Sequence, residues 1–191
     1  MPTPELRSVC VYCGSRFGER PSYRAAANVV GTSLAKAGIR LVFGGGTQGL
    51  MGESAAAARD AGGEVLGIIP TFLMEKEGLL DGIEHEIVET MHERKIKMFE
   101  ACDAFCVLPG GIGTLEEMVE VMSWSSLALH QKPVVLINTD NYWAPFIELV
   151  EHVCEEGFAY PGLRSILHVI DDPAKLVAEV TTQARPSMDK V

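Results

Sequence analysis

The stretch that decides the fold is Ala104-Phe105-Cys106-Val107-Leu108, followed directly by Pro109-Gly110-Gly111-Ile112-Gly113-Thr114-Leu115-Glu116-Glu117. Its first five residues are typical of a short buried strand, and the residues from Thr114 onward have a helical pattern. The glycines in between predict a tight turn from the strand into a helix N-terminus. Backbone N–H groups there have no partner within the helix, and the helix dipole favours an anion. The stretch therefore predicts a phosphate-binding turn with a carboxylate, Glu117, one helical turn away.

Apolar runs and helical patterns alternate along the chain on both sides of this stretch. Strands are expected at 8–12, 39–43, 64–69, 84–89, 104–108, 133–137 and 165–170, and helices at 22–37, 50–61, 91–101, 114–129, 143–156 and 173–181. Such alternation indicates a parallel sheet with helices on both faces. We expect an α/β fold, a Rossmann-like three-layer sandwich whose central parallel sheet has about seven strands. All 191 residues are expected to form one domain, with a core over about 8–181 and a polar, fraying tail from Gln183 to Val191.

A second glycine cluster, Gly44-Gly45-Gly46-Thr47-Gln48-Gly49-Leu50-Met51-Gly52, also lies between an expected strand and helix. Its spacing matches the dinucleotide fingerprint, but the next strand does not end in the acid that binds the ribose. It also has P-loop spacing, but Leu50 and Met51 stand where that motif needs Lys and Ser or Thr. Glycines alone also make tight turns. Two such turns at the carboxyl ends of strands in one small sheet favour a crevice for a monophosphate.

Glu117 and Arg94 are the candidate chemical groups. Thr114-Leu115-Glu116-Glu117 has the pattern of a capping box, in which Glu117 would only cap the helix. However, Glu117 shares a helix face with apolar residues, next to the expected anion site. Burial would raise its pKa and the helix N-terminus would lower it, and the sequence leaves this balance open. Arg94 lies one helical turn from Met91 and from Met98, on a face directed to the core or crevice, although a solvated arginine is the ordinary alternative.

Composition narrows the class of protein. The formal net charge of −10 argues against a nucleic-acid or anionic-membrane partner, and no apolar run approaches the ~20 residues of a membrane helix. The N-terminal residues lack a signal-peptide pattern. Five scattered cysteines indicate reduced thiols and a cytoplasmic location. Cys10 and Cys13 form a lone C-x-x-C at a strand end, where they face opposite sides, so a metal or redox role is not expected.

Three ordered motifs resemble those of a known family. Pro109–Thr114 closed by Glu117 is similar to the P-G-G-x-G-T-x-x-E signature of the Lonely Guy proteins. The segment from Met91 to Lys95 is similar to the M-H-x-R-K segment of that family, and Gly44–Gly52 to its G-G-G-x-x-G-L-M-G loop. Val11–Ser15 resembles its first strand with a C-G-S-like turn. The likeness runs from about Ser8 to Val180.

The resemblance implies a cytokinin riboside 5'-monophosphate phosphoribohydrolase, which cleaves N6-modified AMP to the free base and ribose 5-phosphate. It also implies a dimer that needs no cofactor and no metal, and it makes Arg94 and Glu117 the catalytic pair. Although members are often labelled lysine decarboxylases, no residue here supports that label or pyridoxal phosphate. The positions expected to contact the nucleotide are Ser15, Gly45, Thr47, Glu75, Met91, Arg94, Lys95, Gly111, Ile112, Gly113, Thr114, Leu115, Glu116, Glu117 and Ser123.

Two other functions share these motifs. One is a general nucleosidase for AMP and other nucleotide 5'-monophosphates, and the other is a module that binds a nucleotide or cofactor without chemistry. The helix expected at 114–129 is apolar on most sides, which indicates burial all round and suggests a homodimer built on it.

Overall fold

The computed structural model describes residues 6–184, so most of the expected tail from Gln183 lies outside the described residues. Seven parallel strands form one sheet in the order β4-β3-β2-β1-β5-β6-β7. The strands are β1 (Ser8–Tyr12), β2 (Arg40–Phe43), β3 (Val65–Pro70), β4 (Glu84–Val88), β5 (Ala104–Val107), β6 (Val134–Ile137) and β7 (Leu167–Ile170). The order reverses beside β1, because β5 returns to pair with its other edge. Open α/β sheets bind ligands at such a reversal, outside the carboxyl ends of the strands.

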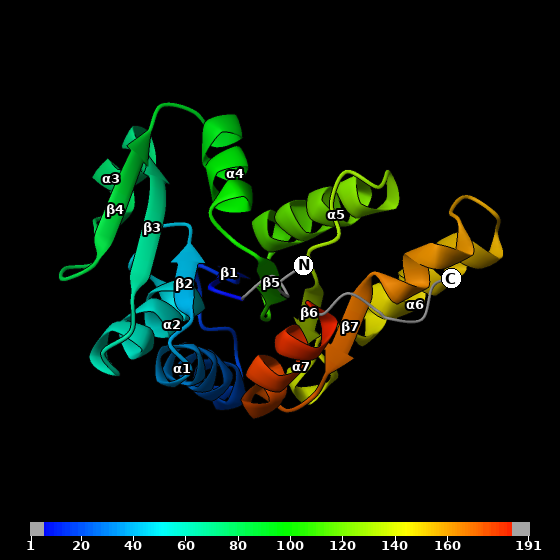
Figure 1. Ribbon diagram of the computed structural model, residues 1–191, viewed down its shortest axis with the longest axis horizontal. Helices are drawn as coiled ribbons and strands as arrows, with labels where there is room; N and C mark the ends of the chain where they lie inside the picture. Colours follow the sequence, from blue (N-terminus) through cyan, green and yellow to red (C-terminus); the bar gives the residue numbers. More distant parts are fainter. Residues whose placement is uncertain (1–5, 185–191) are drawn as a thin grey trace, which may run out of the picture.

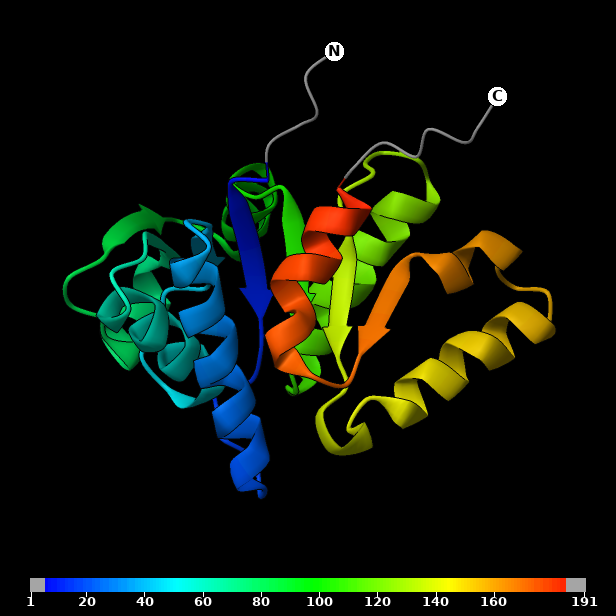
Figure 2. The ribbon, with the colours of Figure 1, turned by 60° about the horizontal axis from the view of Figure 1, so that its bottom comes forward.

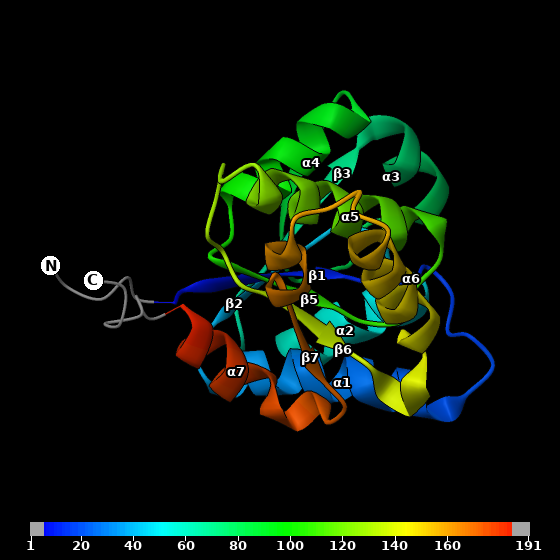
Figure 3. The ribbon, with the colours of Figure 1, turned by 90° about the vertical axis from the view of Figure 1, so that its right-hand side faces the viewer.

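Helices cover both faces of the sheet, as the three-layer prediction requires (Figures 1 and 3). The helices are α1 (Pro21–Lys36), α2 (Gly49–Asp60), α3 (Thr71–Glu77), α4 (Met91–Glu100), α5 (Ile112–Ser126), α6 (Ala144–Glu155) and α7 (Leu176–Gln183), with short 3₁₀ helices at Thr139–Asn141, Pro161–Ser165 and Pro173–Lys175. The first face carries α1, α2 and α7, and Figure 2 shows α1 and α7 across it. The opposite face packs against α4, α5 and α6.

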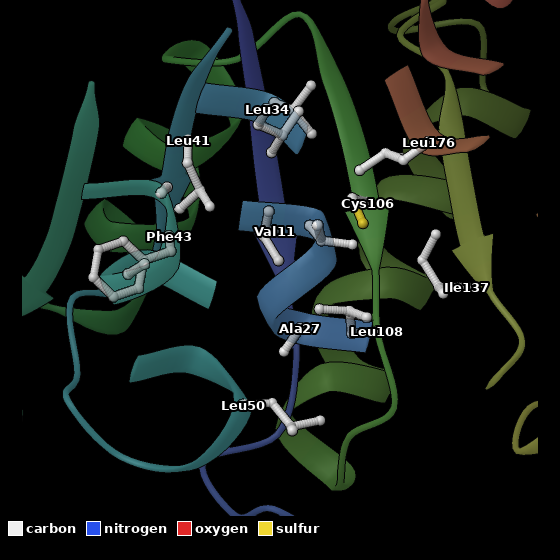
Figure 4. Packing of buried hydrophobic residues seen from close by; sticks show 14 of the residues in the cluster. Val11, Ala27, Leu34, Leu41, Phe43, Leu50, Cys106, Leu108, Ile137 and Leu176 are labelled. Atoms are coloured by element: carbon white, nitrogen blue, oxygen red, sulfur yellow. The ribbon is translucent and has the colours of Figure 1, made fainter. Parts of the chain in front are cut away.

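Two apolar cores hold these layers together, one on each face of the sheet. Alternate strand residues enter opposite cores, so Val9 and Val11 pack with α1 while Cys10 packs with α5. Figure 4 shows the first core, where Val11 and Leu108 face side chains of α1. Cys13, three residues after Cys10, packs against the first core, which confirms that the two cysteines face opposite sides. Continuous apolar strands are therefore buried on both faces.

All seven strands and six predicted helices are present, with boundaries that shift by a few residues. The helix expected at 114–129 runs instead from Ile112 to Ser126, so the turn before it is tighter than predicted. The helix α3 was not predicted at all. None of its seven residues is buried, and a short helix without a buried face leaves little periodicity in the sequence.

Candidate active site

A cavity of about 530 Å³ lies at the carboxyl ends of β1, β2 and β5, beside the point where the strand order reverses. Its walls come from the turns that follow these three strands, together with residues of α2, α3, α4 and α5. The first and third turns are joined directly, because the Gly14 amide donates to the Pro109 carbonyl at 3.0 Å. Both predicted glycine-rich turns contribute, Gly44 from one and Gly110–Thr114 from the other. A cavity of this size suits a small ligand such as a nucleotide.

The turn after β5 ends in an uncapped helix. Gly111 is the N-cap of α5, and no side chain caps it. The capping-box alternative is therefore excluded. Thr114 lies inside the first helical turn, and its side chain packs beside Gly110, where an added Cβ would lie 2.1 Å from Thr114 Oγ1. Because Glu117 lies further along the helix than the box requires, it is not the capping carboxylate.

This helix start presents amides to open space. The first bond of α5 runs from the Leu115 amide to the Gly111 carbonyl at 3.0 Å, so the amides of Ile112, Gly113 and Thr114 precede the helical ladder. Apart from the adjacent residues and the backbone of the same helix, no atom lies within 4 Å of an ideal Cβ at Gly111 or Gly113. An alanine in place of either glycine would therefore not clash with another part of the protein. Both line the cavity, so their exposed backbone is available to an anion.

Arg94 reaches the cavity from α4 and is only 8% exposed. Its Nε donates to the Ile68 carbonyl and its Nη2 to the Gly44 carbonyl, both at 3.2 Å. The guanidinium fills the place of a side chain at Gly44, where a Cβ would lie 1.7 Å from Nη2. The prediction that Arg94 faces the core or crevice is confirmed, and the alternative of a solvated arginine is excluded.

Glu117 forms an ion pair with Arg94, with 3.5 Å between Oε1 and Arg94 Nη1. Its side chain is 11% exposed and lines the cavity. Burial raises the pKa of the Glu117 carboxyl to about 7, although the Arg94 guanidinium acts to lower it. The balance that the sequence left open is thus decided by burial. A carboxyl group that titrates near neutral pH is suited to accept a proton during a reaction.

A second carboxylate, which the sequence analysis did not predict, also lines the cavity. Glu77 lines the cavity from the end of α3, whereas the predicted Glu75, two residues earlier, is exposed and does not. The Glu77 carboxylate lies against Gly46, where a Cβ would be 2.2 Å from Oε2, and its carbonyl accepts from the Thr47 hydroxyl at 2.7 Å. Since α3 was not predicted, the sequence offered no basis for choosing between the two glutamates.

The structure brings seven of the predicted site residues to the cavity and leaves the others outside its lining. Those that line it are Ser15, Arg94, Gly111, Ile112, Gly113, Thr114 and Glu117, and those that do not are Gly45, Thr47, Glu75, Met91, Lys95, Leu115, Glu116 and Ser123. Lys95 instead pairs with Glu116 at 2.6 Å and with Glu120 at 2.9 Å. Nucleotide contacts by this second group stay predictions.

The helix α5 is not buried all round in the single chain, contrary to the prediction. Val119 is 48% exposed and Leu127, just past the end of the helix, is 67% exposed. A largely apolar groove lies between α5, α6 and the segment that follows α6, and it includes Ser123 and the exposed side chains of Phe158 and Tyr160. Within residues 6–184 no helix is long and apolar enough to cross a membrane, and no group of three His, Cys, Asp or Glu side chains is placed to hold a metal.

Solved structures with this architecture are known. The molybdenum cofactor carrier protein of Chlamydomonas reinhardtii superposes with a TM-score of 0.70 at 20% identity, over 94% of this chain and 98% of that one. The molybdenum cofactor binding protein of Rippkaea orientalis gives 0.71 at 19% identity over the same shares. At this identity the likeness establishes the Rossmann-like fold alone.

Sequence relatives are closer. The cytokinin riboside 5'-monophosphate phosphoribohydrolase of Rhodococcoides fascians is 44% identical over 181 residues, which cover 94% of this chain and 90% of the relative. An Arabidopsis thaliana protein of the same name is 41% identical over 96% of this chain and 86% of its own length. The family model described as "possible lysine decarboxylase" matches residues 51–180. These matches, together with the glycine-rich turn and the buried arginine–glutamate pair, show that the chain belongs to this family, the Lonely Guy proteins.

Proposed function

We propose that this protein hydrolyses the N-glycosidic bond of cytokinin riboside 5'-monophosphates and releases the free base and ribose 5-phosphate. The observation that carries the proposal is the position of Glu117, buried beside Arg94 in a cavity that the open start of α5 also lines. The names of the relatives support the same activity. The proposed reaction breaks an N-glycosidic bond, so it differs from the decarboxylation named in the description of the family model.

The 5'-phosphate binds to the amides at the start of α5. A phosphate accepts several hydrogen bonds there, and the helix dipole adds a favourable field. This interaction lies away from the bond that breaks, so its binding energy serves to hold the ribose in place for reaction. The overall negative charge of the chain does not prevent binding, because the local amides and Arg94 act at much shorter range.

Glu117 acts at the anomeric carbon. As the C1'–N9 bond breaks, its electron pair goes to N9 and positive charge develops on the ribose. The carboxylate stabilises this charge and accepts a proton from the water whose oxygen bonds to C1'. The departing purine takes its proton from solvent. Arg94 keeps the Glu117 carboxylate oriented, and its positive charge stabilises the negative charge that develops on the base.

A substrate panel tests the proposal. Wild-type protein is incubated with N6-isopentenyladenosine 5'-monophosphate, with AMP and with the unphosphorylated riboside, and chromatography measures base and ribose 5-phosphate. We expect equal amounts of both products from the modified nucleotide, and a Glu117→Gln variant that binds the nucleotide but releases base about 10³-fold more slowly. An equal rate with plain AMP indicates the general nucleosidase instead. Binding without release of base from any nucleotide contradicts an enzymatic function.

We also propose a homodimer formed through the apolar groove on α5 and α6. Phe158 and Tyr160 are 88% and 85% exposed beside it, and exposed apolar patches of this kind mark interaction surfaces. Light scattering is expected to give twice the chain mass of 20.7 kDa, whereas a monomeric mass would refute the dimer. The five cysteines are free, which supports a cytoplasmic location for the enzyme.

A further inference from the structure

We propose that Tyr142 is a positioning residue for the phosphate-binding turn, a role that rests on the proposed function. Its hydroxyl donates to the Gly110 carbonyl at 2.6 Å, and the residue lines the cavity. Tyr142 follows the 3₁₀ helix Thr139–Asn141, in the connection between β6 and α6. The hydrogen bond thus joins two turns that lie 32 residues apart in the sequence. No sequence motif pointed to this residue.

The hydrogen bond fixes the peptide group that opens the phosphate-binding turn. This peptide lies between Gly110 and Gly111, and two successive glycines have the least restricted backbone of any residue pair. Because a trans peptide is planar, the direction of the Gly110 carbonyl sets the direction of the Gly111 N–H. The Thr114 side chain packs beside Gly110 as well. Tyr142 therefore adds a second constraint on this peptide, one that acts directly on its carbonyl.

Tyr142 is itself held firmly. Its ring packs edge-on against Tyr23, with 5.5 Å between ring centroids, and against Trp143, with 4.9 Å. Trp143 is 2% exposed, and its amide donates to the side-chain oxygen of Asn138 at 2.9 Å. Tyr142 is 37% exposed, and these two ring contacts together with its hydrogen bond to the Gly110 carbonyl hold it at the cavity wall.

The backbone just before Tyr142 has a left-handed conformation that surrounding contacts hold. Asp140 and Asn141 have φ of 53° and 59°, a region that aspartate and asparagine adopt more readily than other residues besides glycine. The Asp140 side chain accepts a hydrogen bond from the Ser22 hydroxyl, and its carbonyl accepts one from Arg20 at 3.2 Å. These contacts hold the segment that directly precedes Tyr142 in the chain.

The test separates a specific effect on phosphate binding from general damage to the cavity. Calorimetry measures the Kd of AMP and of adenosine in Glu117→Gln protein, with and without Tyr142→Phe, so that turnover does not interfere. We expect Tyr142→Phe to raise the Kd of AMP about fivefold to tenfold, the usual effect of losing one hydrogen bond. The Kd of adenosine should stay unchanged. Thr182→Val, which removes a hydroxyl that donates to the Ala178 carbonyl on α7, outside the cavity, is the control and should change neither.

Two outcomes overturn the role of Tyr142. An unchanged AMP affinity means that the hydrogen bond does not position the turn. Equal weakening of AMP and adenosine means that Tyr142 supports the cavity as a whole rather than the phosphate site. In the wild-type background the same substitution should lower kcat/KM for the nucleotide by the same factor. Absence of base release by wild-type protein refutes the proposed function instead, and the binding comparison still decides the role of Tyr142.

Discussion

The two glycine-rich turns of this molecule look alike in sequence but differ in what surrounds their glycines. In the turn after β2, protein atoms occupy the space that side chains would need. A Cβ at Gly44 would meet Arg94, one at Gly46 would meet Glu77, and one at Gly49 would lie 2.3 Å from the backbone of Ser15 and Arg16. Glycine is required there so that charged side chains and a neighbouring turn can approach closely.

In the turn after β5, by contrast, two of the three glycines have open space where a side chain would lie. A Cβ at Gly111 or at Gly113 would have no atom within 4 Å, although Gly110 in the same turn is packed against Thr114. The first turn therefore packs against charged side chains of the cavity, Arg94 and Glu77, and the second leaves open space beside Gly111 and Gly113. The sequence cannot tell a glycine that is packed against other atoms from one that lies beside open space. The surroundings of each Cα in the structure distinguish the two.

The largest difference between the two turns is expected in kcat/KM, after a substitution in the turn that follows β2. Gly44→Ala places a methyl group 1.7 Å from Arg94 Nη2, so the guanidinium must leave its present position beside Glu117. We expect a loss of about 10²-fold in kcat/KM, similar to that of Arg94→Ala, because one charged partner of the reaction is displaced. Steady-state kinetics measures it. The fold should survive, since Gly44 does not have a positive φ and the displaced group ends a flexible side chain. Wild-type kcat/KM would show that the position of Arg94 is unimportant.

A smaller effect of a different kind is expected at the second turn. Gly113→Ala adds a methyl group in open space at the start of α5, where alanine is a better helix former than glycine. We expect an unchanged or higher Tm together with an AMP Kd raised about tenfold, because the methyl group obstructs the approach of a phosphate. Thermal unfolding and calorimetry check the two changes, with Gly44→Ala as the matched substitution. Unaltered AMP affinity would remove this turn from the phosphate site.

The smallest effect concerns pH. Since the pKa of Glu117 is raised to about 7 and the reaction uses its carboxylate, kcat/KM should be half its plateau value near pH 7 and fall about tenfold per unit at lower pH. Rates measured from pH 6.5 to 9 avoid most of the ionisation of the substrate phosphate, whose pKa is about 6. A rate that does not change over this range would contradict the assignment of Glu117 as the base.

Much of the fold and part of the site could be predicted from the sequence. Buried parallel strands and glycine punctuation are local signals, so all seven strands were found. The motif Thr114-Leu115-Glu116-Glu117 left a capping box open as an alternative, and only the structure excludes it, because the helix begins at Ile112 and Thr114 packs on Gly110. Glu77 was missed because its helix has no buried face. Tyr142 was missed because its hydrogen bond to Gly110 depends on a contact between distant turns.

The most direct measurement is a crystal structure of the Glu117→Gln variant with AMP bound. We expect the phosphate oxygens to accept hydrogen bonds from the amides at the start of α5, and C1' of the ribose to face the side chain at position 117. A phosphate bound instead at Gly44–Gly49, or a ribose turned away from position 117, would contradict this expectation.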